Sequence, residues 1–71
     1  MNKTIEYPIT TEYMELIKLL KLLRLVESGG QAKLAVEDGL VMVNGQTEYR
    51  KRAKLRKGDQ IRFDGRQILI K

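Results

Sequence analysis

Hydrophobic and polar residues alternate with a strand-like period at both ends of this 71-residue chain. Residues 3–9 alternate loosely and predict a short strand, and Pro8 is compatible with a strand edge or end. Residues 60–63 alternate in the same way and predict a second strand, and the apolar residues 68–70 are predicted to form the strand that returns beside it. The chain is therefore expected to begin and end in strands.

A leucine-rich stretch after the first strand has apolar residues at helical spacing. These residues cover more than one helical face, so we expect a mostly buried helix: Met14, Leu16, Ile17, Leu19, Leu20 and Leu23. Thr10 can cap its first turn, Glu12 and Glu15 suit its positive end, and Lys21 and Arg24 suit its other end. The alternative is an amphipathic helix on a membrane surface, but so small a domain needs these leucines for its own core.

A second helix is predicted to follow at once. Ser28, with Gln31 three positions later, matches a capping box. Gly29 or Gly30 can take the left-handed conformation that ends the first helix, and Gly39 is placed to end the second. Small side chains form a narrow stripe that allows close packing on a neighbour: Ala32, Ala35 and Val36.

Turn signals divide the rest of the chain into short strands. An Asn-Gly pair at 44–45 and an Asp-Gly pair at 64–65 favour type I′ hairpin turns, and Lys-Gly-Asp at 57–59 favours another turn. The order of one strand, two helices and several short strands predicts a single α+β domain over residues 1–71.

The positive charge lies almost entirely in one segment. The chain has 14 Lys and Arg against nine Asp and Glu, a net charge of +5. Residues 50–57, the basic segment, read RKRAKLRK, which leaves eight basic against nine acidic residues elsewhere. One interpretation is a solvated loop. However, clustered like charges repel one another and disfavour folding, so we expect an anionic partner, most often nucleic acid.

Composition argues against an enzyme. The chain has no Cys and no His, which excludes a disulfide and a thiolate metal site and removes the commonest general base. Asp38, Asp59 and Asp64 stand in turn contexts that explain them. No apolar run approaches a membrane span or a signal peptide. We expect a cytoplasmic protein with no metal, no cofactor, no small-molecule substrate and no membrane contact.

Three linked motifs resemble the S4 RNA-binding domain family. They are GLVMVNG at 39–45, LRKGDQI at 55–61, and Ser28-x-x-x-Ala32 after a leucine-rich helix. The resemblance covers residues 14–63, and the small size resembles free-standing bacterial S4-domain proteins. It implies an S4-like (αL) unit, in which two helices pack on a small sheet of short, mostly antiparallel strands.

The resemblance also implies binding of structured RNA, ribosomal or transfer RNA, in ribosome assembly or translation. The residues at the matching positions, together with the rest of the basic segment, are Lys21, Arg24, Ser28, Gln31, Lys33, Arg50, Lys51, Arg52, Lys54, Arg56 and Lys57. Gly29 stands where many members have Arg, and Leu22 stands where many have a second basic residue. Arg24 stands where the family tends to have a small residue. More of the binding is therefore expected from the basic segment.

Side-chain chemistry agrees with this interpretation. Arginine can hold two phosphate oxygens, whereas lysine acts as a point charge, and Glu37 lies one turn from Lys33 and is expected to neutralise it partly. The few aromatic residues favour a shaped duplex RNA over a single strand. A DNA-binding protein, or an adaptor whose basic loop docks an acidic protein, are the alternatives. We expect a monomer, although strand edges leave pairing open.

Overall fold

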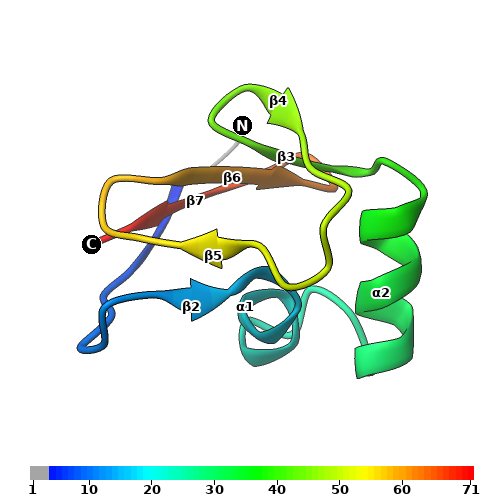
Figure 1. The fold of residues 1–71 in the computed structure, drawn as a ribbon, viewed down its shortest axis with the longest axis horizontal. Helices are drawn as coiled ribbons and strands as arrows, with labels where there is room; N and C mark the ends of the chain where they lie inside the picture. The colour runs from blue at the N-terminus through cyan, green and yellow to red at the C-terminus, as the bar shows by residue number, and fades with distance from the viewer. Residues whose placement is uncertain (1–3) are drawn as a thin grey trace.

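The computed structural model describes residues 4–71 and has the predicted α+β class (Figure 1). Lys3, the first residue of the predicted N-terminal strand, lies outside the described residues. The elements in chain order are β1 (Thr4–Tyr7), β2 (Met14–Glu15), α1 (Leu16–Leu22), α2 (Gly29–Glu37), β3 (Val41–Val43), β4 (Gln46–Thr47), β5 (Lys54–Leu55), β6 (Gln60–Phe63) and β7 (Arg66–Ile70).

The strands form two sheets. The larger has the order β1-β7-β6-β3-β4, and its β1–β7 pair is parallel while the other pairs are antiparallel. Val43 pairs with Ile61, which pairs with Ile68, so one face of the sheet carries a continuous apolar row. The smaller sheet consists of β2 and β5. Figure 1 shows α1 and this two-stranded ribbon below the larger sheet, with α2 beside them.

Both helices contribute to one hydrophobic core. Leu16, Leu19 and Leu20 of α1 have no exposed surface, and burying each contributes roughly 1.5–3 kcal/mol. The small-residue stripe of α2 is buried as predicted: Ala32, Ala35 and Val36. These three leucines of α1 are therefore used within the fold, and the membrane-surface interpretation of this helix is wrong, although Leu22 at its end is exposed.

The predicted start of α1 is also wrong. The helix begins at Leu16 rather than after Thr10, and its N-cap residue, Glu15, makes no capping hydrogen bond through its side chain. The first helical N–H groups instead find distant acceptors: Leu16 N–H donates to the Ala53 carbonyl (2.9 Å) and Ile17 N–H donates to the Lys51 carbonyl (3.3 Å). Because the basic segment supplies these acceptors, a local cap is unnecessary.

An arginine, not a glycine, ends α1. Arg24 has φ 57°, Leu25 N–H donates to the Leu20 carbonyl (3.0 Å) and Arg24 N–H donates to the Lys21 carbonyl (3.1 Å). This is the Schellman arrangement. The prediction that Gly29 or Gly30 would end this helix is wrong, because both lie inside α2.

The remaining turn predictions are confirmed. Gly39 (φ 74°) ends α2 with the same pair of hydrogen bonds, from its own N–H to Val36 and from Leu40 N–H to Ala35. The pairs at 44–45 and 64–65 each have two positive φ angles, which is the type I′ geometry that closes the β3–β4 and β6–β7 hairpins.

Candidate nucleic-acid interface

The basic segment is a fixed part of the fold rather than a solvated loop. Ala53 and Leu55 are buried, while Arg52, Lys54 and Arg56 are exposed. This alternation arises because β5 pairs with β2, so that successive side chains point to opposite sides. Two buried apolar side chains therefore anchor the segment and direct its cations outward.

The basic segment also joins the two helices. Its backbone carbonyls at Lys51 and Ala53 accept the hydrogen bonds from the start of α1 described above. The Lys51 ammonium forms a salt bridge of 2.9 Å with the Glu37 carboxylate at the end of α2. The position of the segment relative to both helices is thus set by hydrogen bonds and by one ion pair.

Lys33 is not neutralised in the way that the sequence suggested. The salt bridge of Glu37, one turn away on α2, is with Lys51. The expectation that Glu37 partly cancels the charge of Lys33 is therefore wrong, because a cation from a distant segment takes the carboxylate. Lys33 has no salt bridge with residues 4–71.

Arg50 at the start of the basic segment is engaged by Glu48. Its Nε and Nη2 atoms donate to the two carboxylate oxygens of Glu48 at 3.0 and 3.2 Å, and its backbone N–H donates to one of them at 3.0 Å. The hydrogen bond from the Arg50 side chain is the main cause that lowers the pKa of Glu48. The same contact raises the pKa of Arg50. The guanidinium itself remains exposed to solvent.

Lys54 is steered by an aromatic ring. Its ammonium lies 4.8 Å from the centroid of the Tyr13 ring, a cation–π distance. Tyr13 belongs to the loop before β2, and its ring is partly exposed. Lys54 therefore keeps its charge available at the surface while its direction is restricted.

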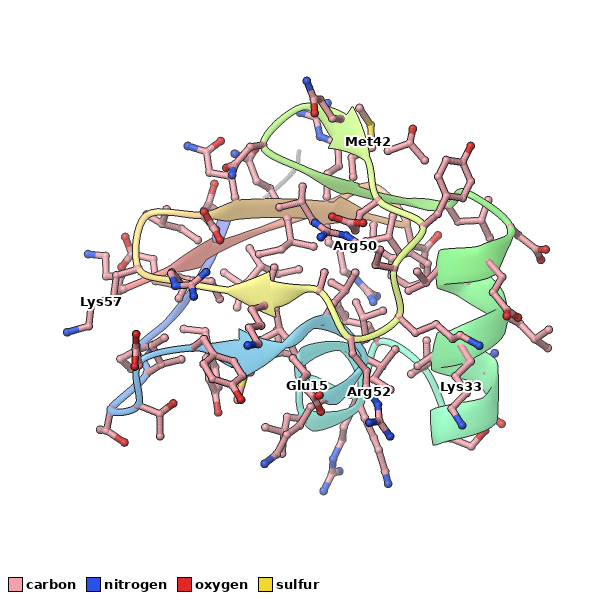
Figure 2. All side chains as sticks on the ribbon, viewed as in Figure 1. Glu15, Lys33, Met42, Arg50, Arg52 and Lys57 are labelled. Atoms are coloured by element: carbon pink, nitrogen blue, oxygen red, sulfur yellow. The ribbon has the colours of Figure 1, made fainter. Side chains whose placement is uncertain are left out.

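The other candidate cations form no salt bridge among residues 4–71: Lys21, Arg24, Lys33, Arg52, Lys54, Arg56 and Lys57. Figure 2 shows Arg52 and Lys33 near the same edge of the molecule, beside α1 and α2, and Lys57 at the opposite end. In this view Arg52 and Lys33 lie on the same side of the molecule, and Lys57 lies far from both.

Ser28 and Gln31 build the start of α2. The Ser28 hydroxyl accepts from Gln31 N–H at 3.2 Å, so the predicted N-cap is confirmed. The Gln31 side-chain oxygen accepts from Glu27 N–H, one residue before the partner that a capping box uses. Both polar side chains thus make contacts within the protein that hold the beginning of the helix.

A side-chain clasp that no local sequence pattern indicates holds two turns together. Asn44 donates from Nδ2 to Asp59 (3.1 Å) and accepts at Oδ1 from Gln60 N–H (2.9 Å). Asp59 also accepts from Arg56 N–H (2.8 Å), which confirms its assignment to turn chemistry. Each turn is visible in the sequence, but their contact depends on the antiparallel pairing of β3 and β6. The clasp fixes the end of the basic segment.

The described part of the chain holds neither a membrane-spanning helix nor a cluster of metal ligands. No helix within residues 4–71 is both long enough and apolar enough to cross a membrane. Over the same residues, no group of three or more acidic, His or Cys side chains is arranged to hold a metal ion.

Known proteins share this fold and these sequence features. The S4 domain family matches residues 7–71. The protein named "Putative RNA-binding protein YbcJ" of Escherichia coli (strain K12) is 43% identical over 58 residues, 82% of this chain and 83% of that protein. "Probable ribosome maturation protein RlbA" of Bacillus subtilis (strain 168) is 37% identical over 57 residues, 80% of each chain.

A solved structure is similar over nearly the whole chain. The solution structure of YbcJ from E. coli, described as revealing an αL motif involved in RNA binding, has a TM-score of 0.73 and 37% identity, and the match covers 99% of this chain and 90% of that one. The family match, the sequence relatives and the shared fold agree with the motifs at 39–45 and 55–61. The chain belongs to the S4 domain family.

Proposed function

We propose that this protein binds structured RNA, without catalysing a reaction, through the basic segment and the adjoining ends of α1 and α2. The main support is that carbonyl groups of the segment cap α1 and that Lys51 is joined to α2, so the cations stand on a rigid support. A rigid array of cations suits a duplex RNA, whose phosphates have fixed spacing.

The salt bridges divide the candidate RNA-contact residues into cations that pair with a glutamate and cations that do not. We assign the main phosphate contacts to Arg52, Lys33 and Lys54. These cations have no carboxylate partner among residues 4–71, and they lie on the basic segment and on α2, which the Lys51–Glu37 salt bridge joins. Arg50 and Lys51 are paired with glutamates and chiefly position the segment. The remaining candidates extend the surface or shape it: Lys21, Arg24, Ser28, Gln31, Arg56 and Lys57.

We further propose that the RNA is ribosomal RNA in a maturing subunit, bound by a monomer in the cytoplasm. The support is the name of the B. subtilis relative, which describes a ribosome maturation protein, and the E. coli relative named for RNA binding.

Fluorescence anisotropy with a labelled ribosomal RNA hairpin and a DNA duplex of equal length tests this function. We expect tighter binding to the RNA, with an affinity that falls linearly on a log–log plot against salt concentration, because cations displace counterions from phosphates. Equal affinity for DNA at every salt concentration would support the nucleoid-type alternative and contradict the proposal.

A matched pair of variants locates the interface. Arg52→Ala should weaken RNA binding roughly fivefold and reduce the salt slope by about 1. Arg62→Ala removes the same charge from β6, where Arg62 pairs with Met42 across the sheet; Figure 2 shows Met42 on the opposite side of the molecule from Arg52. We expect Arg62→Ala to bind like the wild type. Equal losses in both variants would mean that net charge alone drives binding.

A further inference from the structure

An apolar groove lies beside α2 and contains no residue of the basic segment. It has a volume of about 310 Å³ and runs between α2 and the β6–β7 turn. Its apolar lining includes Leu34 and Leu40, which are 60% and 58% exposed, and the half-buried Leu25 and Phe63. In Figure 1, β6 ends on the side of the molecule where α2 lies, so the turn that follows forms the far wall.

Helical geometry separates this groove from the basic segment. Gln31, Leu34, Ala35 and Asp38 follow one another at spacings of three and four residues and share one face. The adjacent row of α2 carries Lys33 and Glu37, and Glu37 contacts the basic segment through Lys51. One helix therefore presents Lys33 and Glu37 on the side of the basic segment and apolar residues on the side of the groove.

The rim of the groove is acidic. Asp38 and Asp64 line it, and none of its lining residues is basic. Neither carboxylate forms a salt bridge with residues 4–71. In a chain of net charge +5, this groove offers exposed leucines beside two uncompensated negative charges.

We propose that this groove docks a basic, amphipathic segment of a protein partner. Apolar side chains of the partner would contact Leu34, Leu40 and Phe63, and its Lys or Arg side chains would face Asp38 and Asp64. RNA does not fit, because its phosphates would meet two carboxylates. The two surfaces share one residue, Gln31, and the groove contains no residue of the basic segment, so the two kinds of binding should be separable.

Two synthetic peptides of 12 residues test the proposal, one of leucine and arginine at helical spacing and one with glutamate in place of arginine. In ¹⁵N NMR titrations of the full chain, we expect the arginine peptide to shift the amide signals of Leu34, Asp38 and Leu40. The glutamate peptide should leave those signals in place and shift the basic segment instead, because each peptide is repelled by the surface of its own charge.

Variants that neutralise the two rim carboxylates measure how much of the peptide affinity comes from charge rather than from apolar contact. Asp38→Asn with Asp64→Asn should weaken the arginine peptide about fivefold, as expected for two exposed charge pairs. Asparagine tolerates the positive φ of 54° at position 64, so the hairpin should be retained. Glu12→Gln, in the loop before β2, is the control and should bind like the wild type.

Four outcomes would overturn the proposal. The arginine peptide leaves the groove signals unchanged, or both peptides shift them equally, which indicates unselective apolar contact. The groove signals move with protein concentration alone, which indicates a second copy of the chain. The RNA hairpin shifts the groove signals directly while the basic segment is unaffected.

Discussion

Arg24 occupies a conformation that most side chains avoid. Its φ of 57° costs a non-glycine residue roughly 1–2 kcal/mol, and the equivalent position at the end of α2 is Gly39. A strained residue that the fold retains is a sign of function. Its guanidinium at the end of α1 belongs to the proposed RNA interface, and we infer that arginine is retained here for RNA binding despite the strained backbone.

Glycine at position 24 should therefore separate stability from binding. Arg24→Gly removes both strain and charge and should raise the free energy of unfolding by up to about 1 kcal/mol, measured by urea denaturation. Arg24→Ala removes the charge but keeps the strain, so it should not be stabilised. Both should bind the RNA hairpin more weakly than the wild type. If the glycine variant is no more stable than the alanine variant, the strain is absent.

The Glu48–Arg50 contact predicts a specific response to acid. Because Arg50 lowers the folded-state pKa of Glu48, the contact stabilises the fold above the ordinary glutamate pKa of about 4.3. That contribution should be lost as pH falls through the lower folded-state value. An NMR titration of the Glu48 carboxyl should show its pKa returning toward the ordinary range in Arg50→Ala. An unchanged Glu48 pKa in this variant would contradict the assignment.

At the scale of elements, the sequence predicted the turns and helix ends that are set by neighbouring residues. The Asn-Gly and Asp-Gly turns, the Ser28 cap and the Gly39 stop each depend on a few neighbouring residues, and each is present. The start of α1 could not be predicted in this way, because the acceptors for Leu16 and Ile17 N–H are Ala53 and Lys51, which lie more than thirty positions later. The end of α1 has no glycine to mark it.

The candidate site divides similarly. The basic segment could be predicted from its run of Lys and Arg residues, and Ser28 could be predicted as a helix cap from its neighbours. The sequence could not predict which cations pair with a carboxylate, because Glu37 lies next to Lys51 only when α2 packs beside the basic segment. The clasp between Asn44 and Asp59 escaped notice for the same reason.

Two similar hairpins allow the clasp to be measured. Asn44 and Asp64 both open type I′ turns, with φ of 52° and 54°. Among residues 4–71, Asn44 makes side-chain hydrogen bonds to Asp59 and Gln60, and Asp64 makes none. Asn44→Gly should therefore lower the free energy of unfolding by about 1–2 kcal/mol relative to Asp64→Gly. Chemical denaturation gives the free energy of unfolding of both variants, and equal values would show that the clasp does not contribute to stability.

At the scale of the whole molecule, the charge is unevenly placed. Uncompensated cations lie along the proposed RNA interface, while the groove beside α2 carries two carboxylates. The free protein should be destabilised by repulsion among its cations, whereas the RNA complex should be stabilised by attraction to them.

Salt should therefore act in opposite directions on the two forms. Raising the salt concentration to about 0.15 M should raise the melting temperature of the free protein, because the Debye length falls to about 8 Å. The same change should lower the melting temperature of the RNA complex, because binding weakens. Thermal unfolding followed by circular dichroism measures both, and parallel shifts would contradict this view of the charge distribution.

The carbonyls of Lys51 and Ala53 that cap α1 have a thermodynamic consequence for recognition. Since the carbonyls of the segment accept hydrogen bonds from the start of a core helix, we expect the segment to unfold together with the core. The conformational entropy of its backbone is lost when the protein folds, not when RNA arrives. A free peptide of residues 50–57 has the same charges but must lose that entropy on binding, so it should bind the RNA hairpin far more weakly than the domain.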